Sequence, residues 1–327
     1  MSSHVQPRVE LVGSGSPVQG MAAGREVGAG NPEPRETEFT VEARSQWRNA
    51  FRRFLKHRLA VASLIVFIAL VLLVFIGQPL WHYKYNVYSN DLSVKPSLKH
   101  PFGTDSDGFD TFARVLRGSQ RSLEIAGFVA LTSTFVGTIY GAIAGYFRGP
   151  ADAVMMRLVD LLLVFPVIAI AGVLTYTLGS KANGWLYIAA ILAFFTWPYV
   201  SRIVRGNALS IREKEYIEAA RALGATHTRT IIRHVVPNVI GQIIVTVTIL
   251  MATAILAETS LSFIGLGVQA PDTSLGLLVS AAQPAVQTRP WLFYFPGLFI
   301  IIIALTVNFI GDGLRDALDP TANRVRA

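Results

Sequence analysis

The chain of 327 residues has no cysteine, which excludes disulfide bonds, thiolate metal ligands and a catalytic thiol. It also lacks the G-x-x-x-x-G-K-[ST] loop that holds ATP phosphates and the H-E-x-x-H motif that binds zinc. His227 and His234 share one basic loop but have no third ligand beside them. Because no nucleophile–base pair or ligand cluster is recognisable, we expect the chain to be no enzyme and to bind no metal.

Charged residues are scarce as well, at 15% of the chain where a soluble domain has about 25%. Apolar residues make up 52% and form runs long enough to cross a bilayer, which takes about 20 helical residues. We predict an all-α membrane protein with six transmembrane helices. They are expected at 59–79, 124–146, 157–178, 185–203, 239–258 and 292–311, and Pro198 interrupts the fourth.

The basic residues are distributed unevenly between the two sides of these spans. The net charge is +8, and most of the 29 Lys and Arg residues fall in segments 1–58, 147–157, 204–238 and 312–327. Cytoplasmic segments carry such an excess in membrane proteins, so it does not require nucleic acid as a partner. We therefore predict a multi-pass membrane protein with both termini in the cytoplasm, and the resemblance to a known family described below implies that this membrane is the bacterial inner membrane.

Three segments lie outside the regular spans. Residues 1–44 have few large apolar side chains and are predicted to be a disordered cytoplasmic tail. Residues 45–58 are basic and amphipathic, which predicts a helix on the membrane surface. The segment 261–290 is too apolar for a free loop and too often broken by Gly and Pro for a span, so we expect it to fold back into the membrane surface.

A polar segment within 204–238 stands out between two long apolar runs. Helix-forming residues extend from Leu209 to Leu223 and end at Gly224, a good helix C-cap. A second helix begins near Arg229 and is expected to stop or kink at Pro237. A helix rich in alanine that ends in glycine can fit a groove on a cytoplasmic partner, and we interpret this segment as a docking surface.

A few residues within the spans carry chemical information. Asp160 lies three residues after Arg157, which predicts a structural ion pair on one helix face. Glu258, at the outer end of the fifth span, is interpreted as an interfacial carboxylate, with a gate or substrate contact as the alternative. A glycine repeat in the second span predicts close helix packing within the chain. It consists of Gly137, Gly141 and Gly145.

The polar segment carries a resemblance to a known family. Glu218-Ala219-Ala220-x-x-x-Gly224, followed by Pro237-Asn238, resembles the EAA loop of ABC importer permeases. Other segments resemble dipeptide and oligopeptide permeases, C-type subunit. They are His100–Asp110, where Phe109 stands in place of the usual Arg, Arg157-x-x-Asp160 with Phe165-Pro166, Glu258–Gly267, Pro290-Trp291 with Phe295-Pro296-Gly297, and Gly311–Pro320. The resemblance covers about residues 50–320.

The resemblance implies a type I ABC importer permease fold, with a six-span permease domain at 59–320 and a C-terminal tail at 321–327. It implies a cytoplasmic coupling helix that docks on an ATPase, formed by Glu218, Ala219, Ala220, Arg221, Leu223 and Gly224. It also implies a scoop-like element facing the binding protein, whose candidate pathway residues are Glu258, Ser262, Phe263, Gly265 and Gly267.

The implied partners are a homologous B-type permease subunit, two ATPase domains and an extracytoplasmic substrate-binding protein. This chain is expected to bind no cofactor, since ATP and Mg belong to the ATPase subunits. Peptides are the expected cargo, and nickel or glutathione remains an alternative because related C-type subunits serve those substrates. A carrier of another class, driven by ions and without ATPases, would use Asp160 and Glu258 as relay groups.

Overall fold

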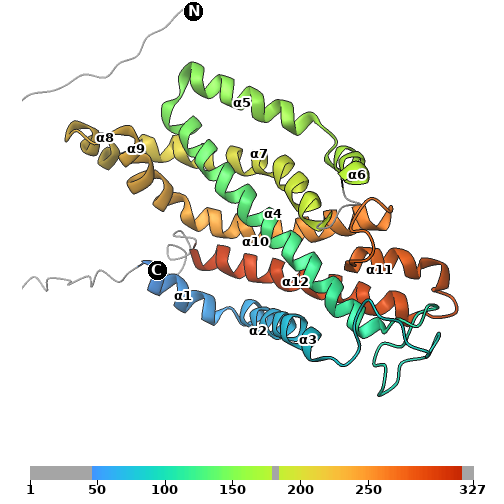
Figure 1. The fold of residues 1–327 in the computed structure, drawn as a ribbon. Helices are drawn as coiled ribbons and strands as arrows, with labels where there is room; N and C mark the ends of the chain where they lie inside the picture. Colours follow the sequence, from blue (N-terminus) through green and yellow to red (C-terminus); the bar gives the residue numbers. More distant parts are fainter. Residues whose placement is uncertain (1–45, 179–183, 319–327) are drawn as a thin grey trace, which may run out of the picture. The chain divides into compact units, whose positions relative to one another are not determined.

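The computed structural model describes residues 46–178 and 184–318, and the tails predicted at 1–44 and 321–327 lie outside this part of the chain. The described residues are mostly helical, and the longest connection between helices is 81–110 (Figure 1). In chain order the elements are α1 (Gln46–Lys56), α2 (Arg58–Leu72), the π-helix η1 (Leu73–Gly77), α3 (Gln78–Leu80), α4 (Thr111–Phe147), α5 (Gly149–Val164), α6 (Val167–Leu178), α7 (Gly184–Arg212), α8 (Glu215–Ala222), α9 (His227–Thr230), the π-helix η2 (Ile231–Val235), α10 (Val236–Phe263), α11 (Leu275–Ala282), the 3-10 helix η3 (Gln283–Ala285) and α12 (Trp291–Leu318).

Five helical stretches of the described chain are long and apolar enough to cross a membrane. They are Arg58–Leu80, Thr111–Phe147, Gly184–Arg212, His227–Phe263 and Trp291–Leu318. The predicted third span is a bent pair instead, since α5 and α6 meet at an angle of 75°. The bend falls at Phe165-Pro166, where proline cannot supply the N–H that a continuous helix needs. Counting this pair as one span gives the predicted six.

Local capping fixes where several of these helices begin. The Asp110 carboxylate accepts a hydrogen bond from the amide of Ala113 at 2.8 Å and starts α4. His57 separates α1 from α2, and its Nδ1 accepts from the amide of Ala60 at 3.1 Å. Such side-chain acceptors satisfy amide groups that a helix leaves free at its first turn. Helix α1 therefore ends where α2 enters the membrane-spanning part of the chain.

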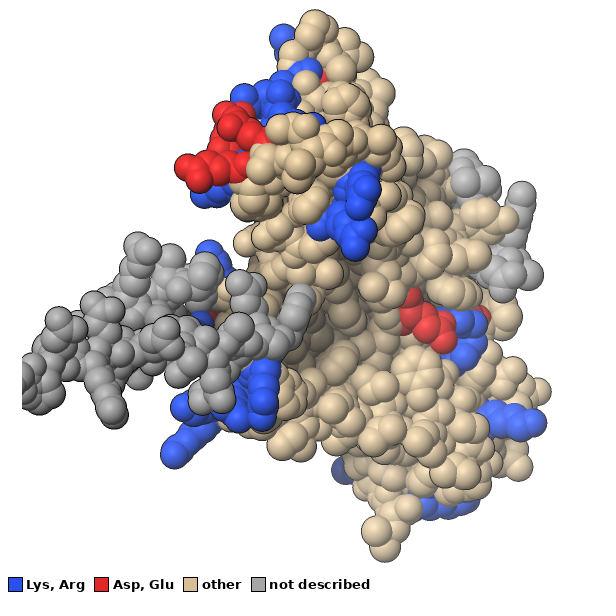
Figure 2. All heavy atoms as spheres, turned by 90° about the vertical axis from the view of Figure 1, so that its left-hand side faces the viewer, with Lys and Arg blue, Asp and Glu red and all other residues tan. Residues whose placement is uncertain are grey.

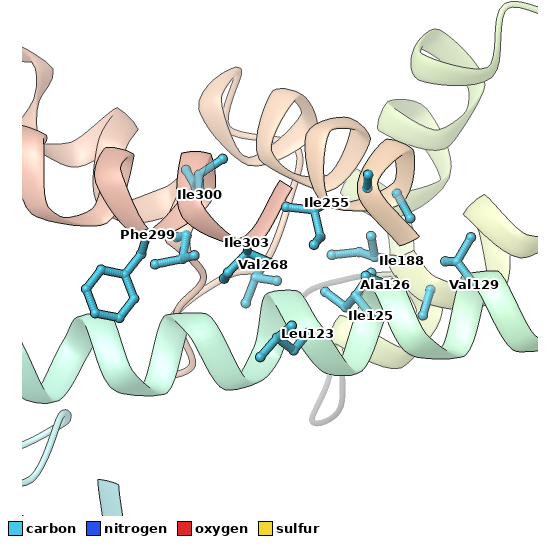
Figure 3. Packing of buried hydrophobic residues seen from close by; sticks show 14 of the residues in the cluster. Leu123, Ile125, Ala126, Val129, Ile188, Ile255, Val268, Phe299, Ile300 and Ile303 are labelled. Atoms are coloured by element: carbon cyan, nitrogen blue, oxygen red, sulfur yellow. The ribbon is translucent and has the colours of Figure 1, made fainter. Parts of the chain in front are cut away.

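The buried core lies where α4 meets α7, α10 and α12. Figure 3 shows buried side chains of α4, such as Ile125 and Val129, in one cluster with Ile188 of α7, Ile255 of α10 and Ile303 of α12. Burying apolar side chains between helices removes them from contact with lipid and brings their atoms to packing distance. Helix α4 is thus the central element that the other long helices contact.

The glycine repeat of α4 packs against α7. A Cβ atom on Gly137 would lie 2.5 Å from Cβ of Val200, and one on Gly145 would lie 2.8 Å from Cβ of Ala208. Small residues with this spacing let two helix backbones approach closely. The predicted close packing within the chain is confirmed, and it makes α4 and α7 a tightly joined pair.

Candidate functional site

Helix α8 forms the centre of the segment predicted to dock on a partner. It ends in a two-bond cap, because the amide of Ala225 donates to the carbonyl of Ala220 at 3.0 Å and that of Gly224 donates to the carbonyl of Arg221 at 2.9 Å. This pattern needs a residue of positive φ, and Gly224 has φ +83°. A Cβ atom on Gly224 would meet nothing within 4 Å. The tip of the segment is therefore open to solvent.

The exposed residues of α8 match those predicted to face a partner only in part. Glu218, Ala219 and Ala222 are exposed, and Leu223 is 89% exposed. Ile217 is fully buried and anchors the helix to the rest of the protein. An exposed leucine at the tip of a small helix is available for contact with another protein. Arg221, by contrast, is half-buried and turns inward, as described below.

The structure differs from the sequence prediction on both sides of α8. The helix expected from Leu209 to Leu223 is broken at Lys214, whose ψ of 138° is extended. We attribute the break to packing, because burial of Ile217 outweighs the favourable helical propensity of Arg212, Glu213 and Lys214. The second helix does not stop at Pro237, because α9, η2 and α10 form one run from His227 to Phe263. The wider turn of the π-helix η2 precedes Pro237, which lies in the first turn of α10, where its missing N–H is tolerated.

Lys and Arg side chains gather on the end of the molecule that carries α1, α8 and α9, with a patch of Asp and Glu beside them (Figure 2). On α1 the exposed basic residues are Arg48, Arg52 and Lys56. On α8 the acidic residues of the first turn are Glu215 and Glu218. This end of the protein offers both signs of charge to a partner within a small area.

The predicted ion pair of Arg157 and Asp160 is wrong. Asp160 instead pairs with Arg202 of α7. Asp152 of α5 likewise binds an arginine of α7, because it accepts two hydrogen bonds of 2.6 Å from Arg205. Helix α7 packs along α5, so Arg202 and Arg205 of α7 pair with Asp160 and Asp152. Arg157, one turn before Asp160 on α5, is not its partner. Asp152 is buried at 8% exposure, so its pairing with Arg205 is a structural requirement.

Glu258 is not an interfacial carboxylate, because it is fully buried. Its oxygens accept hydrogen bonds from the hydroxyl of Ser122 on α4 at 3.0 Å and that of Ser262 on α10 at 2.7 Å. The hydroxyl of Ser274, the N-cap of α11, lies 3.1 Å from that of Ser262. Buried carboxylates need such partners, and here they come from three separate elements. Glu258 therefore holds α4, α10 and α11 together.

The segment 261–290 that follows α10 packs against the protein, and its return into the membrane surface stays a prediction. Of the pathway candidates within it, Phe263 and Gly265 are exposed, whereas Ser262 and Gly267 are buried against each other. Asp272 connects the segment to α4 through ion pairs with Arg117, at 2.9 Å, and with Arg121. The short helix α11 then leads by way of η3 toward α12.

The connection from α3 to α4 is organised by a buried histidine. His100 is 1% exposed and lies between two carboxylates, with Nδ1 2.8 Å from Asp110 and Nε2 3.1 Å from Asp91. Asp110 also accepts a hydrogen bond of 3.0 Å from the indole N–H of Trp81. Lys99 donates to Asp91 at 2.5 Å and lowers the pKa of that carboxyl below its usual range. The motif His100–Asp110 therefore braces this connection.

Within the described ranges, no group of three or more His, Asp or Glu side chains is placed to hold a metal ion. Sequence reasoning missed the contacts of Tyr146, Asp152 and Arg205, which join elements far apart in the chain. For Asp152 and Arg205 the sequence offered one signal, because both are charged residues beside apolar spans, where charged residues usually have a partner.

The chain is similar to known transport proteins over most of its length. The family model described as the binding-protein-dependent transport system inner membrane component matches residues 137–324. The model of the N-terminal TM domain of oligopeptide transport permease C matches residues 45–101. A solved chain of the MetNI methionine ABC transporter, in an inward facing conformation, has 16% identity and a TM-score of 0.51, and covers 64% of this chain and 97% of that one.

Relatives with curated names share more of the sequence. The oligopeptide transport system permease protein OppC of Mycobacterium tuberculosis is 43% identical over 276 residues, which cover 84% of this chain and 94% of that protein. OppC of Escherichia coli K12 is 42% identical over 288 residues, covering 86% and 94%. The dipeptide transport system permease protein DppC of Alkalihalophilus pseudofirmus is 38% identical over 292 residues, covering 89% and 94%.

The helical fold, the spans and these matches agree with one another. The chain therefore belongs to the family of binding-protein-dependent transport system inner membrane components and is a multi-pass inner-membrane permease with the type I ABC importer fold.

Proposed function

We propose that this chain is the C-type permease subunit of an ATP-driven importer that moves di- or oligopeptides into the cytoplasm. The observation that carries the proposal is the 43% identity with an oligopeptide permease over 84% of the chain. A dipeptide permease at 38% identity over 89% of the chain supports the same class of cargo. Nothing in the described residues favours nickel or glutathione over peptide.

The proposal requires several partners. A homologous permease completes the pathway, an extracytoplasmic binding protein delivers the peptide, and two ATPase domains bind ATP and Mg. This chain itself catalyses no reaction and holds no cofactor. The concentration of basic residues on the end that carries α1, α8 and α9 supports a cytoplasmic location for that end and for both termini (Figure 2).

Helix α8 is the surface we assign to the ATPase contact. Glu218, Ala219, Ala220, Leu223 and Gly224 remain candidates for direct contact, since they are exposed or half-buried at the tip of the segment. ATP-driven closure of the ATPases moves α8, and the spans then switch between inward and outward access. The ATPases have to bind α8 differently in their two states, because equal binding would shift no equilibrium.

The outer segment 261–290 is the element we assign to the peptide pathway and the binding protein. Its exposed side chain Phe263 and exposed Gly265 are the candidates for contact. Glu258 and Ser262 act differently in this proposal, because both are buried and fix the segment in place. We assign Glu258 no proton relay, because its carboxylate accepts hydrogen bonds from Ser122 and Ser262 and so has a structural role.

The experiment that tests the proposal uses the complete complex in proteoliposomes and compares Leu223→Asp with Leu98→Asp. Leu98 is fully exposed in the connection before α4 and provides a matched change at the opposite end of the spans. We expect Leu223→Asp to reduce co-purified ATPase and ATP-driven peptide uptake at least tenfold. Leu98→Asp should leave ATPase binding unchanged.

Two results would contradict the proposal. Peptide uptake that continues without any ATPase would favour a carrier of another class. ATP-driven uptake of nickel or glutathione, with no uptake of peptides of two to five residues, would keep the architecture and change the cargo.

A further inference from the structure

We propose that Tyr146 is the positioning residue through which movement of α8 reaches α4; this inference rests on the proposed function. Tyr146 lies in the last turn of α4 and is 2% exposed. Its hydroxyl oxygen lies 3.1 Å from Nδ1 of His227 on α9 and 3.3 Å from Nε of Arg221 on α8. One phenol group therefore contacts both helices of the segment that we assign to the ATPase.

The donors and acceptors of this cluster are compatible. Arg221 can only donate, so its Nε–H donates to the hydroxyl oxygen of Tyr146. The single hydroxyl proton of Tyr146 can then be donated to Nδ1 of His227, which accepts in the neutral tautomer that carries its proton on Nε2. The hydroxyl thus joins α8 to α9 through α4, and a phenylalanine in its place would break both bonds.

The ring and the backbone of Tyr146 add further contacts. The guanidinium carbon of Arg221 lies 4.8 Å from the ring centroid, and that of Arg212, at the end of α7, lies 5.9 Å away. Arg212 also donates to the main-chain carbonyl of Tyr146. The ring of His227 contacts that of Phe147, with centroids 5.4 Å apart. Helices α4, α7, α8 and α9 therefore meet at this residue.

The rest of α4 is suited to carry a displacement away from Tyr146. The helix runs without interruption from Thr111 to Phe147, which corresponds to about 55 Å at 1.5 Å per residue. Its glycine repeat joins it closely to α7, so the two helices move together. Ser122, in the first half of α4, donates to Glu258 of α10 and accepts a hydrogen bond of 3.4 Å from the amide of Leu275 in the outer segment. A shift of α8 can therefore reach the outer end through a single rigid helix.

The alternative is that Tyr146 only fills space, in which case its ring matters and its hydroxyl does not. Tyr146→Phe separates the two cases, because it keeps the ring and removes the hydroxyl. Tyr140→Phe is the matched control: Tyr140 lies on the same helix and its hydroxyl donates to the carbonyl of Met155 on α5 at 3.0 Å, away from α8. Both variants lose one hydroxyl from α4.

The experiment measures peptide taken up per ATP hydrolysed by the complete complex in proteoliposomes. We expect Tyr146→Phe to assemble and to hydrolyse ATP, with the transport ratio reduced at least threefold. Tyr140→Phe should keep the wild-type ratio. His227→Phe should reduce the ratio in the same direction, and combining it with Tyr146→Phe should add little, because both changes remove the same bond.

A wild-type ratio in a Tyr146→Phe complex that assembles normally would overturn the proposal. If Tyr146→Phe assembles poorly, the distance between two spin labels tests the proposal instead. The labels are attached at Ile139→Cys on α4 and Ala222→Cys on α8, which are both exposed positions in a chain without cysteine. We expect one narrow distance distribution through the ATP cycle in wild type and a broad one in His227→Phe. Identical distributions would overturn the proposal. Absence of ATP-driven peptide uptake in wild type would instead contradict the proposed function.

Discussion

The close approach of α4 and α7 predicts opposite effects for the same substitution at two glycines of α4. Gly137 faces α7: a Cβ atom there would lie 2.5 Å from Cβ of Val200 and 2.7 Å from the carbonyl oxygen of Trp197, whereas ordinary contacts begin at 3.4 Å. Gly127 lies two to three turns earlier, and a Cβ atom there would meet nothing within 4 Å. Gly137→Ala and Gly127→Ala therefore form a matched pair.

The magnitudes follow from packing and helix propensity. To accept a methyl group at Gly137, α7 has to move by about 1 Å, and well-packed interiors have no free volume for such a shift. Overpacking of this kind costs about 1–3 kcal/mol. Alanine in place of glycine inside a helix gains about 1 kcal/mol at both positions. We expect Gly137→Ala to be less stable than wild type by up to about 2 kcal/mol, and Gly127→Ala to be more stable than wild type by up to about 1 kcal/mol, so the two variants should differ by about 1–3 kcal/mol.

The assay is thermal unfolding of the assembled complex in nanodiscs, followed by tryptophan fluorescence. A change of 1 kcal/mol shifts Tm by about 2–4 °C in domains of 150–250 residues. We expect Gly137→Ala to unfold about 2–12 °C below Gly127→Ala. Equal melting temperatures for the two variants would refute the reasoning, because they would mean that α7 does not lie against Gly137.

Three further predictions concern the charged residues. Glu258→Leu should lower the free energy of unfolding by about 2–4 kcal/mol, since it leaves buried serine hydroxyls without their acceptor. Glu258→Gln should lower the free energy of unfolding less, and denaturation in detergent measures both variants. Arg205→Ala should cost about 3–5 kcal/mol because Asp152 stays buried without its partner, and Arg205→Lys should recover part of the loss in the same measurement. The hydrogen bond from Lys99 lowers the pKa of Asp91 below its ordinary value of 3.8. The contribution of Asp91 to stability is therefore complete above pH 3.8 and is lost as the pH falls through the lower folded-state pKa. Hydrogen exchange of residues 81–110 should show this loss, and Asp91→Asn should abolish the pH dependence.

Much of the fold could be predicted because its determinants are local in sequence. The apolar runs give the spans, and the repeat of Gly137, Gly141 and Gly145 gives the face of α4 that packs closely. Gly224 was predictable as a cap because only a residue that tolerates positive φ fits there. The bend between α5 and α6 had a visible cause in Pro166 and could have been placed from it.

The contacts of the candidate sites could not be predicted in the same way. Spacing on one helix favours Arg157 as the partner of Asp160, but α7 places Arg202 closer, and a sequence does not show which helix packs against α5. Glu258 looked interfacial because it ends an apolar run, and it is buried because α11 folds over it. Tyr146 carried no signal of its own, since its partners on α7, α8 and α9 come more than sixty residues later in the chain.

Two polar contacts join α4 to the continuous helical stretch of α9, η2 and α10, and we expect the two contacts to have different roles. The two helical stretches run in opposite directions, and side-chain hydrogen bonds join them near both ends, between Tyr146 and His227 and between Ser122 and Glu258. The α10 side contains the π-helix η2 and Pro237 between these contacts, whereas α4 has no break. Bending on the α10 side is therefore the easier motion, and α4 is the stiffer member.

This difference gives each contact a separate expected role. Because α4 is stiff, losing the contact at Tyr146 should uncouple transport from ATP hydrolysis while the protein remains folded. Losing the contact at Glu258 should destabilise the fold, because the carboxylate is buried and fixes three elements at once. A variant of Tyr146 that melted early and kept its transport ratio would reverse this assignment.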